Sequence, residues 1–92
     1  MLKISEMASQ PGAPRTYLLE GRVSGLWVNE LRRVCLRPGT PADGTVLDLS
    51  GVSFVDRAGL ALFGDLAERG VHFTNGSPFI TEQLKEVVHD LR

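Results

Sequence analysis

The sequence has little of several features that mark particular classes of protein. It contains one cysteine, Cys35, which excludes an internal disulfide and a cysteine-rich metal site. No stretch approaches the roughly 20 apolar residues that a membrane-spanning helix needs. The first residues, 1–6, lack the apolar core of a signal peptide. Together these features predict a protein that works in the cytoplasm, without disulfides and without insertion into a membrane.

The chain also lacks an excess of basic residues. Its 10 Lys and Arg residues are balanced by 11 Asp and Glu residues, which gives a formal net charge of −1. Neither nucleic acid nor an anionic membrane is therefore an expected partner. The local basic cluster is interspersed with acids, and we interpret it as a solvated helix face. The cluster consists of Arg22, Arg32, Arg33 and Arg37, with Glu20 and Glu30 among them.

Motifs for catalysis or for binding a cofactor are missing as well. The sequence contains no G-x-S-x-G turn, no P-loop and no G-x-G-x-x-G fingerprint. His72, His89 and Cys35 are not at the spacing of metal ligands, and Cys35 is expected to be a small buried apolar residue. We therefore predict a protein that is not an enzyme and that holds no metal and no cofactor.

What the sequence does contain is the composition of one globular domain over residues 1–92. Apolar residues make up 42% of the chain and charged residues 23%. Apolar and alternating runs predict strands at Leu2–Met7, Thr16–Glu20, Thr45–Leu49 with Val52–Val55, and Val71–Thr74. The breaker at Pro11–Pro14 predicts a hairpin whose second strand stops at Gly21. Ser50-Gly51 are expected to bend the third strand, and Phe54 is expected to face the core.

Apolar residues at helical spacing predict three helices. The first is expected to follow Ser24 as its N-cap, the second to run from about 57 to 69 behind the N-cap Asp56, and the third to start at Ser77-Pro78. Gly70 is expected to end the second helix. The buried faces are expected to carry Trp27, Leu31, Val34 and Cys35, then Leu62, Phe63 and Leu66, then Ile80, Leu84, Val87, Val88 and Leu91.

The predicted order is strand, strand, helix, strand, helix, strand, helix. Strands that alternate with helices imply parallel pairs joined by crossover helices. The fold class is therefore α/β: a small mixed sheet of about four strands, with the helices packed mainly on one face.

Three segments carry a resemblance to a known family. They are LLEGRVSG at Leu18–Gly25, TVLDLSGVSFVDRAGL at Thr45–Leu60, and the closing helix from Ser77. On these residues the chain resembles a STAS domain, the fold of bacterial anti-sigma factor antagonists and of the cytoplasmic tail of sulfate transporters. The resemblance spans nearly the whole chain, and the central segment is its most specific part. It implies a STAS-like fold and a role in signalling and transcription regulation through protein–protein interaction.

The sequence departs from the family pattern where the family's chemistry takes place. In phosphorylatable members the positions of Arg57 and Ala58 are commonly both small and hydroxylated. The Ser at the position of Ala58 accepts phosphate from a partner kinase that is itself an anti-sigma factor, and the unphosphorylated form binds that kinase and frees the sigma factor. Ala58 has no hydroxyl, so this position cannot be phosphorylated. Ser50 and Ser53 lie nearby, and each is expected to bond to local backbone.

The leading hypothesis is a non-catalytic module that docks on a kinase-type anti-sigma factor. Its contact surface would consist of Asp56, Arg57, Ala58, Gly59 and Leu60, together with Gly21 and Ser24. Asp56 also caps the following helix, and Gly59 allows close backbone approach. Two alternatives are a STAS-type regulatory subunit of a transport or ATPase complex, and a module that binds a small ligand or nucleotide beside Ala58 and Gly59.

Overall fold

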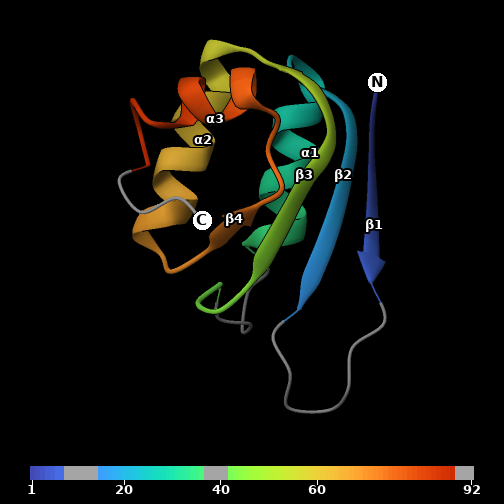
Figure 1. The fold of residues 1–92 in the computed structure, drawn as a ribbon. Helices are drawn as coiled ribbons and strands as arrows, with labels where there is room; N and C mark the ends of the chain where they lie inside the picture. Colours follow the sequence, from blue (N-terminus) through green and yellow to red (C-terminus); the bar gives the residue numbers. More distant parts are fainter. Residues whose placement is uncertain (8–14, 37–41, 89–92) are drawn as a thin grey trace.

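The computed structural model describes residues 1–7, 15–36 and 42–88 (Figure 1). Its elements are β1 (Leu2–Met7), β2 (Thr16–Val23), α1 (Leu26–Cys35), β3 (Val46–Val55), α2 (Arg57–Glu68), β4 (His72–Thr74) and α3 (Pro78–Leu84). This order confirms the predicted alternation of strands and helices. Pro11–Pro14, the breaker of the hairpin, lies outside the described residues, as do Arg37, His89 and Leu91.

Within the described part of the chain, the strands form a sheet in the order β1-β2-β3-β4. β1 pairs antiparallel with β2, so that Leu2 lies opposite Gly21, and this confirms the hairpin. β2 pairs parallel with β3, and β3 parallel with β4. Because β2 continues to Val23, the prediction that this strand stops at Gly21 is wrong. Gly21 adopts a φ of 107° inside the strand, which suits glycine.

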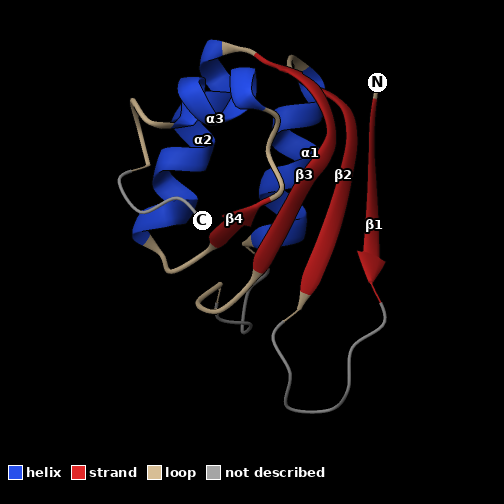
Figure 2. Ribbon diagram, in the orientation of Figure 1, coloured by secondary structure: helices blue, strands red, loops and turns tan. Residues whose placement is uncertain are grey.

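The helices cover one face of the sheet, as predicted (Figure 2). The crossovers through α1 and α2 both step in the same direction across the sheet, from β2 to β3 and from β3 to β4. Right-handed crossovers that step in one direction place their helices on the same face. The opposite face is open and carries exposed polar side chains such as Lys3, Glu20 and Ser50.

The core lies between the sheet and the helices. Tyr17 and Leu19 from β2 and Leu47 and Leu49 from β3 alternate into it. The helices contribute Val28, Leu31 and Cys35 from α1, Leu62, Phe63 and Leu66 from α2, and Ile80 and Leu84 from α3. The Phe63 and Phe73 rings pack with their centroids 5.1 Å apart. The fold thus confirms the predicted buried face of α2 and the start of the one on α3.

Two irregularities in β3 correct the prediction for Phe54. The pairing of β2 with β3 shifts register between Leu18 and Glu20 and again between Gly21 and Arg22. Each shift adds a residue to β3, which is one continuous strand and not two runs around a bend. Because of the second shift, Val52 and Val55 both point toward the core although they are three positions apart. Phe54 therefore points outward and is 39% exposed. The prediction that Phe54 faces the core is therefore wrong.

The start of α1 also differs from the prediction. The N-cap is Gly25, with φ 57° and ψ −131°, and not Ser24. Glycine adopts this backbone conformation at little cost, whereas serine does not. Trp27 is 36% exposed, and Val28 takes its place in the buried stripe with Leu31. Both Trp27 and Val28 fit helical spacing from Leu31, so the sequence pattern alone does not choose between them.

The local signals predicted the end of α2 correctly, but they did not predict the early end of α3. Gly70, with φ 92°, follows α2, and the Val71 N–H donates to the Leu66 carbonyl across it, as in a Schellman motif. The Ser77 side chain caps α3 by accepting from the Ile80 N–H, as predicted. However, α3 ends at Leu84, so the prediction of a helix that continues to Leu91 is wrong for residues 85–88.

Candidate functional site

The junction between β3 and α2 is organised around the Asp56 carboxylate. Its Oδ1 accepts a hydrogen bond from the Gly59 N–H, with 2.7 Å between nitrogen and oxygen, and this confirms Asp56 as the N-cap of α2. Its Oδ2 accepts from the Gly25 N–H at 3.1 Å. The Asp56 N–H in turn donates to the Val23 carbonyl at 3.1 Å. Asp56 therefore joins the end of β2, the start of α1 and the start of α2.

The first turn of α2 presents Arg57 and Ala58 to solvent, whereas Gly59 is buried beneath them. A Cβ atom at position 59 would lie 2.8 Å from the Val23 carbonyl oxygen, closer than real Cβ contacts. Glycine is therefore required for the close approach of α2 to the sheet, as expected. Leu60 is partly buried. The residues that a partner could touch directly are thus Arg57, Ala58 and part of Leu60.

Gly21 and Ser24 lie near this turn but mainly shape the backbone. A Cβ atom on Gly21 would collide with the Met1 carbonyl oxygen, so the pairing of β1 with β2 needs glycine there. The Gly21 carbonyl accepts from the Ser53 hydroxyl at 3.3 Å. Ser24 is partly buried, and its carbonyl accepts from the Trp27 N–H at 3.1 Å. Gly21 thus lies within β2, whereas Ser24 follows the end of that strand.

Three exposed apolar side chains surround the junction, and sequence reasoning missed them as surface residues. Leu26 is 81% exposed in the first turn of α1, beside Trp27. Phe54 precedes the Asp56 cap by two residues. The Arg22 guanidinium carbon lies 5.6 Å from the centre of the Phe54 ring, a cation–π distance. Arg22 is on β2, so its assignment to a solvated helix face is wrong.

A groove runs beside the junction, between α2 and the end of α3. It has a volume of about 510 Å³ and is lined by Phe54, Val55, Asp56, Arg57, Leu60, Ala61, Gln83, Glu86 and Val87. We call it the α2–α3 groove. The Gln83 Oε1 atom is buried and has no hydrogen-bond partner among the described residues. The groove therefore combines apolar walls with a cation at its α2 side and an acid at its α3 side.

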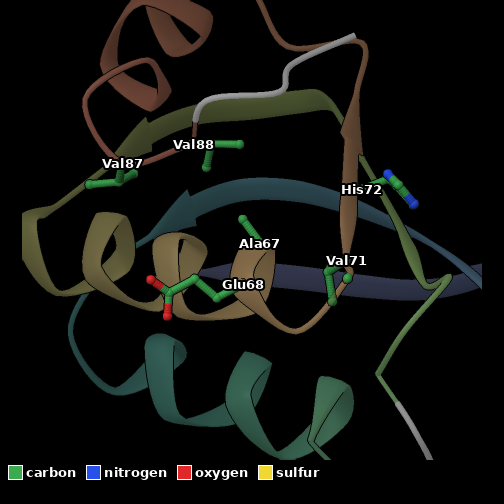
Figure 3. Close-up of a pocket in the computed structure, with 7 residues that line it drawn as sticks. Ala67, Glu68, Val71, His72, Val87 and Val88 are labelled. Atoms are coloured by element: carbon green, nitrogen blue, oxygen red, sulfur yellow. The ribbon is translucent and has the colours of Figure 1, made fainter.

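A second cavity lies at the other end of α2 and offers less chemistry. It has a volume of about 270 Å³ and is lined by Ala67, Glu68, Gly70, Val71, His72, Val87 and Val88. Figure 3 shows that its two ionisable side chains, Glu68 and His72, point in opposite directions. An acid–base pair that converges on a ligand is not formed there.

The ionisable groups with shifted pKa values lie away from the junction. Burial raises the pKa of the Cys35 thiol to about 11, and the charge of Arg15 opposes this weakly. Burial also raises the pKa of Asp48, but hydrogen bonds from Ser50 and from the Asn75 side chain outweigh it and lower the pKa overall. In residues 1–7, 15–36 and 42–88 no group of three or more His, Cys, Asp or Glu could hold a metal ion. Both shifts move the pKa of the group away from neutral pH, so neither residue is poised for proton transfer.

Comparison with known proteins gives no match to a protein-family model and none to a curated protein. Among the described residues, no helix has both the length and the apolar character required to cross a membrane.

Proposed function

We propose that the chain is a STAS-type, non-catalytic interaction module that acts in the cytoplasm as an anti-sigma factor antagonist. Its partner is a kinase-type anti-sigma factor, and its docking surface is the first turn of α2. The observation that carries this proposal is the exposed Ala58 at a helix start that Asp56 fixes through two backbone bonds.

The geometry supports docking because the contact surface is already ordered. Asp56 holds the starts of α1 and α2 together, and Gly59 holds α2 against the sheet. A partner that binds an ordered surface loses less conformational entropy than one that must order a loop. The exposed groups are the methyl group of Ala58, the guanidinium of Arg57 and part of the Leu60 side chain, and such groups can pack against a protein partner.

Ala58 makes the proposed docking permanent. A phosphate at this position would add a charge of about −1.5 to −2 next to the interface and would oppose docking. Alanine carries no hydroxyl and so keeps the unmodified surface at all times. Regulation would then act on the partner or on the amount of this protein.

Two specific observations favour other candidates. The missing phosphoacceptor also suits a regulatory subunit of a transport or ATPase complex, in which no phosphorylation cycle is needed. The α2–α3 groove, with its volume of about 510 Å³, suits a small ligand such as a nucleotide. A thermal-shift screen with nucleotides tests the second candidate, because a ligand that binds the folded state raises Tm.

The test of the main proposal compares proteins captured from a lysate of the source organism by three immobilised variants. The wild-type chain and His72→Glu should retain a kinase-type ATPase, identified by mass spectrometry, whereas Ala58→Glu should lose it. His72 is the matched control because it is exposed at the start of β4, opposite the first residue of β3. Retention of the same ATPase by Ala58→Glu would contradict the proposal, and capture of transporter components would favour the alternative.

A second readout tests the permanent surface. With ATP and the captured kinase, the wild-type chain should gain no phosphate, whereas Ala58→Ser should gain it on the peptide from Asp56 to Leu66. A phosphate on the neighbouring Ser50 or Ser53 of the wild-type chain would disprove the permanent docking surface.

A further inference from the structure

We infer that the α2–α3 groove takes an acidic, amphipathic segment of a protein partner, with its carboxylates beside Arg22 and Arg57 and an apolar side chain against Phe54 and Leu60. This inference rests on the proposed function, because it assigns the chemistry of the partner that docks at the same junction.

The first argument is that several arginines on the surface form ion pairs, whereas the two beside the groove do not within the described residues. Arg32 and Arg69 both lie within 4 Å of Asp65, and Arg33 lies 3.4 Å from Glu30. Within the described residues, Arg22 and Arg57 have no such ion pair, although Asp56 is adjacent in sequence to Arg57. Both oxygens of Asp56 accept backbone hydrogen bonds. The Asp56 carboxylate is therefore already engaged.

The second argument is that Arg22 and Arg57, neither of them ion-paired in the described part of the chain, flank one apolar surface. Arg22 lies over the Phe54 ring, and Phe54 and Arg57 line the same groove. Phe54 is 39% exposed, and Leu60 is partly exposed in the same wall. An exposed aromatic ring next to unpaired guanidinium groups matches the composition of protein–protein interfaces, where aromatic residues and Arg are enriched.

The third argument sets the orientation of the segment. Glu86 lines the α3 side of the groove and repels an acid placed there. The carboxylates of the partner must therefore lie at the Arg57 side, and its apolar side chain must lie between the two. Two cations with acids nearby are too few for a nucleic acid or an anionic membrane, which engage many phosphates or a cluster of basic residues.

A second copy of the chain is the competing occupant. Its α1 presents Leu26, Trp27 and Glu30, which together have the required apolar and acidic character. Glu30 is paired with Arg33 in its own helix, however. Docking of a second copy would have to break or share this pair, so the structure favours a foreign segment.

The test uses three labelled helical peptides of identical length with the same leucine anchors. The positions that differ lie together at one end of each peptide. They carry Glu in the first peptide, Gln in the second and Lys in the third. Fluorescence anisotropy measures their affinities, and amide chemical shifts of the isotope-labelled chain locate the site. The Glu peptide should bind about 5- to 20-fold more tightly than the Gln peptide at low salt, since each exposed charge pair contributes about two- to fivefold. High salt should remove most of this difference.

Charge reversal provides the matched comparison. The double variant Arg22→Glu and Arg57→Glu should prefer the Lys peptide, whereas Arg69→Glu should keep the wild-type preference, because Arg69 lies at the other end of α2 and does not line the groove. Equal affinity for the three peptides, absence of binding at millimolar peptide, or shift changes away from Phe54, Arg57 and Gln83 would each overturn the inference. Concentration-dependent shifts at the groove without peptide would assign it to a second copy and would also overturn it.

Failure of this inference can be told apart from failure of the proposed function. If the captured ATPase binds wild-type chain and the Arg22→Glu, Arg57→Glu variant equally at every salt concentration, the acidic segment is disproved while docking at Ala58 stands. If the peptides discriminate as expected but no ATPase depends on Ala58, the groove assignment stands and the proposed partner is wrong.

Discussion

Replacement of Asp56 by alanine is the sharpest test of the junction, because one carboxylate there accepts two backbone hydrogen bonds. The bond from Gly59 is partly buried, whereas the bond from Gly25 is exposed. Without the carboxylate, the buried Gly59 N–H has no acceptor, which costs about 1–3 kcal/mol. Water can replace the acceptor at Gly25, so that loss costs about 0.5 kcal/mol. Asp56→Ala should therefore lower the free energy of unfolding by about 1.5–3.5 kcal/mol.

A graded series separates the two bonds. Asp56→Asn keeps one carbonyl oxygen, which can serve Gly59, but it turns an amide NH₂ toward the Gly25 N–H. It should cost about 0.5–1 kcal/mol, in line with the similar capping strength of Asn and Asp. Urea unfolding followed by circular dichroism measures the series. For a domain of this size each kcal/mol lowers Tm by about 4–8 °C, so Asp56→Ala should lower Tm by about 6–28 °C.

The control for the series is Glu68→Ala, at the exposed end of α2, which should change stability by less than about 0.5 kcal/mol. If Asp56→Ala costs no more than this control, the carboxylate does not hold the junction. If Asp56→Asn costs as much as Asp56→Ala, the negative charge matters and the count of accepted bonds does not, and the geometric argument is refuted.

Three further outcomes follow from the packing and the pKa values. Gly59→Ala should destabilise the fold by about 1–3 kcal/mol in urea unfolding, because the added Cβ would meet the Val23 carbonyl. This cost exceeds the gain from the better helix propensity of alanine, and a stabilised variant would show instead that α2 can shift. The fold raises the pKa of the Cys35 thiol from 9.0 to about 11, so the protonated thiol stabilises the fold in full below pH 9. This stabilisation, about 2–3 kcal/mol, is lost as the pH rises through about 11. A Cys35→Ala variant should lack this pH dependence of the free energy of unfolding, and a profile like that of the wild type would contradict the assignment. Phe54→Gln should cost less than about 1 kcal/mol, because Phe54 is a surface residue, whereas truncation of the buried Phe63 to alanine should cost about 3–5 kcal/mol; comparable losses would place Phe54 in the core.

Much of the fold could be predicted because its signals are local. The Ser77-Pro78 start of α3 and the Gly70 end of α2 each depend on residues within one helical turn. The alternation of strands and helices then predicts parallel pairs with right-handed crossovers, whereas the strand order β1-β2-β3-β4 comes from the structure. Side-chain direction within β3 could not be predicted in the same way, since the phase of Phe54 depends on two register shifts against β2.

Within the candidate site, the capping role of Asp56 could be predicted because its signal is local as well. Asp56 is a local capping signal, and Ala58 is recognisable from the resemblance to STAS domains. The bond from Asp56 to Gly25 joins residues 31 positions apart, and no local pattern encodes it. The bond engages the N–H of Gly25, the residue that takes the N-cap position of α1 in place of Ser24.

This long-range bond decides what kind of surface the junction can be. Because Asp56 holds both helix starts, Leu26 on α1 and Ala58 on α2 belong to one ordered surface. Both oxygens of Asp56 accept backbone hydrogen bonds, so the carboxylate is fixed in one orientation between the two helix starts. The exposed side chains beside it are apolar, as in Leu26 and Ala58, or cationic, as in Arg57. Under the proposed function, the absence of a hydroxyl at position 58 would remove a means of control and leave this surface unchanged.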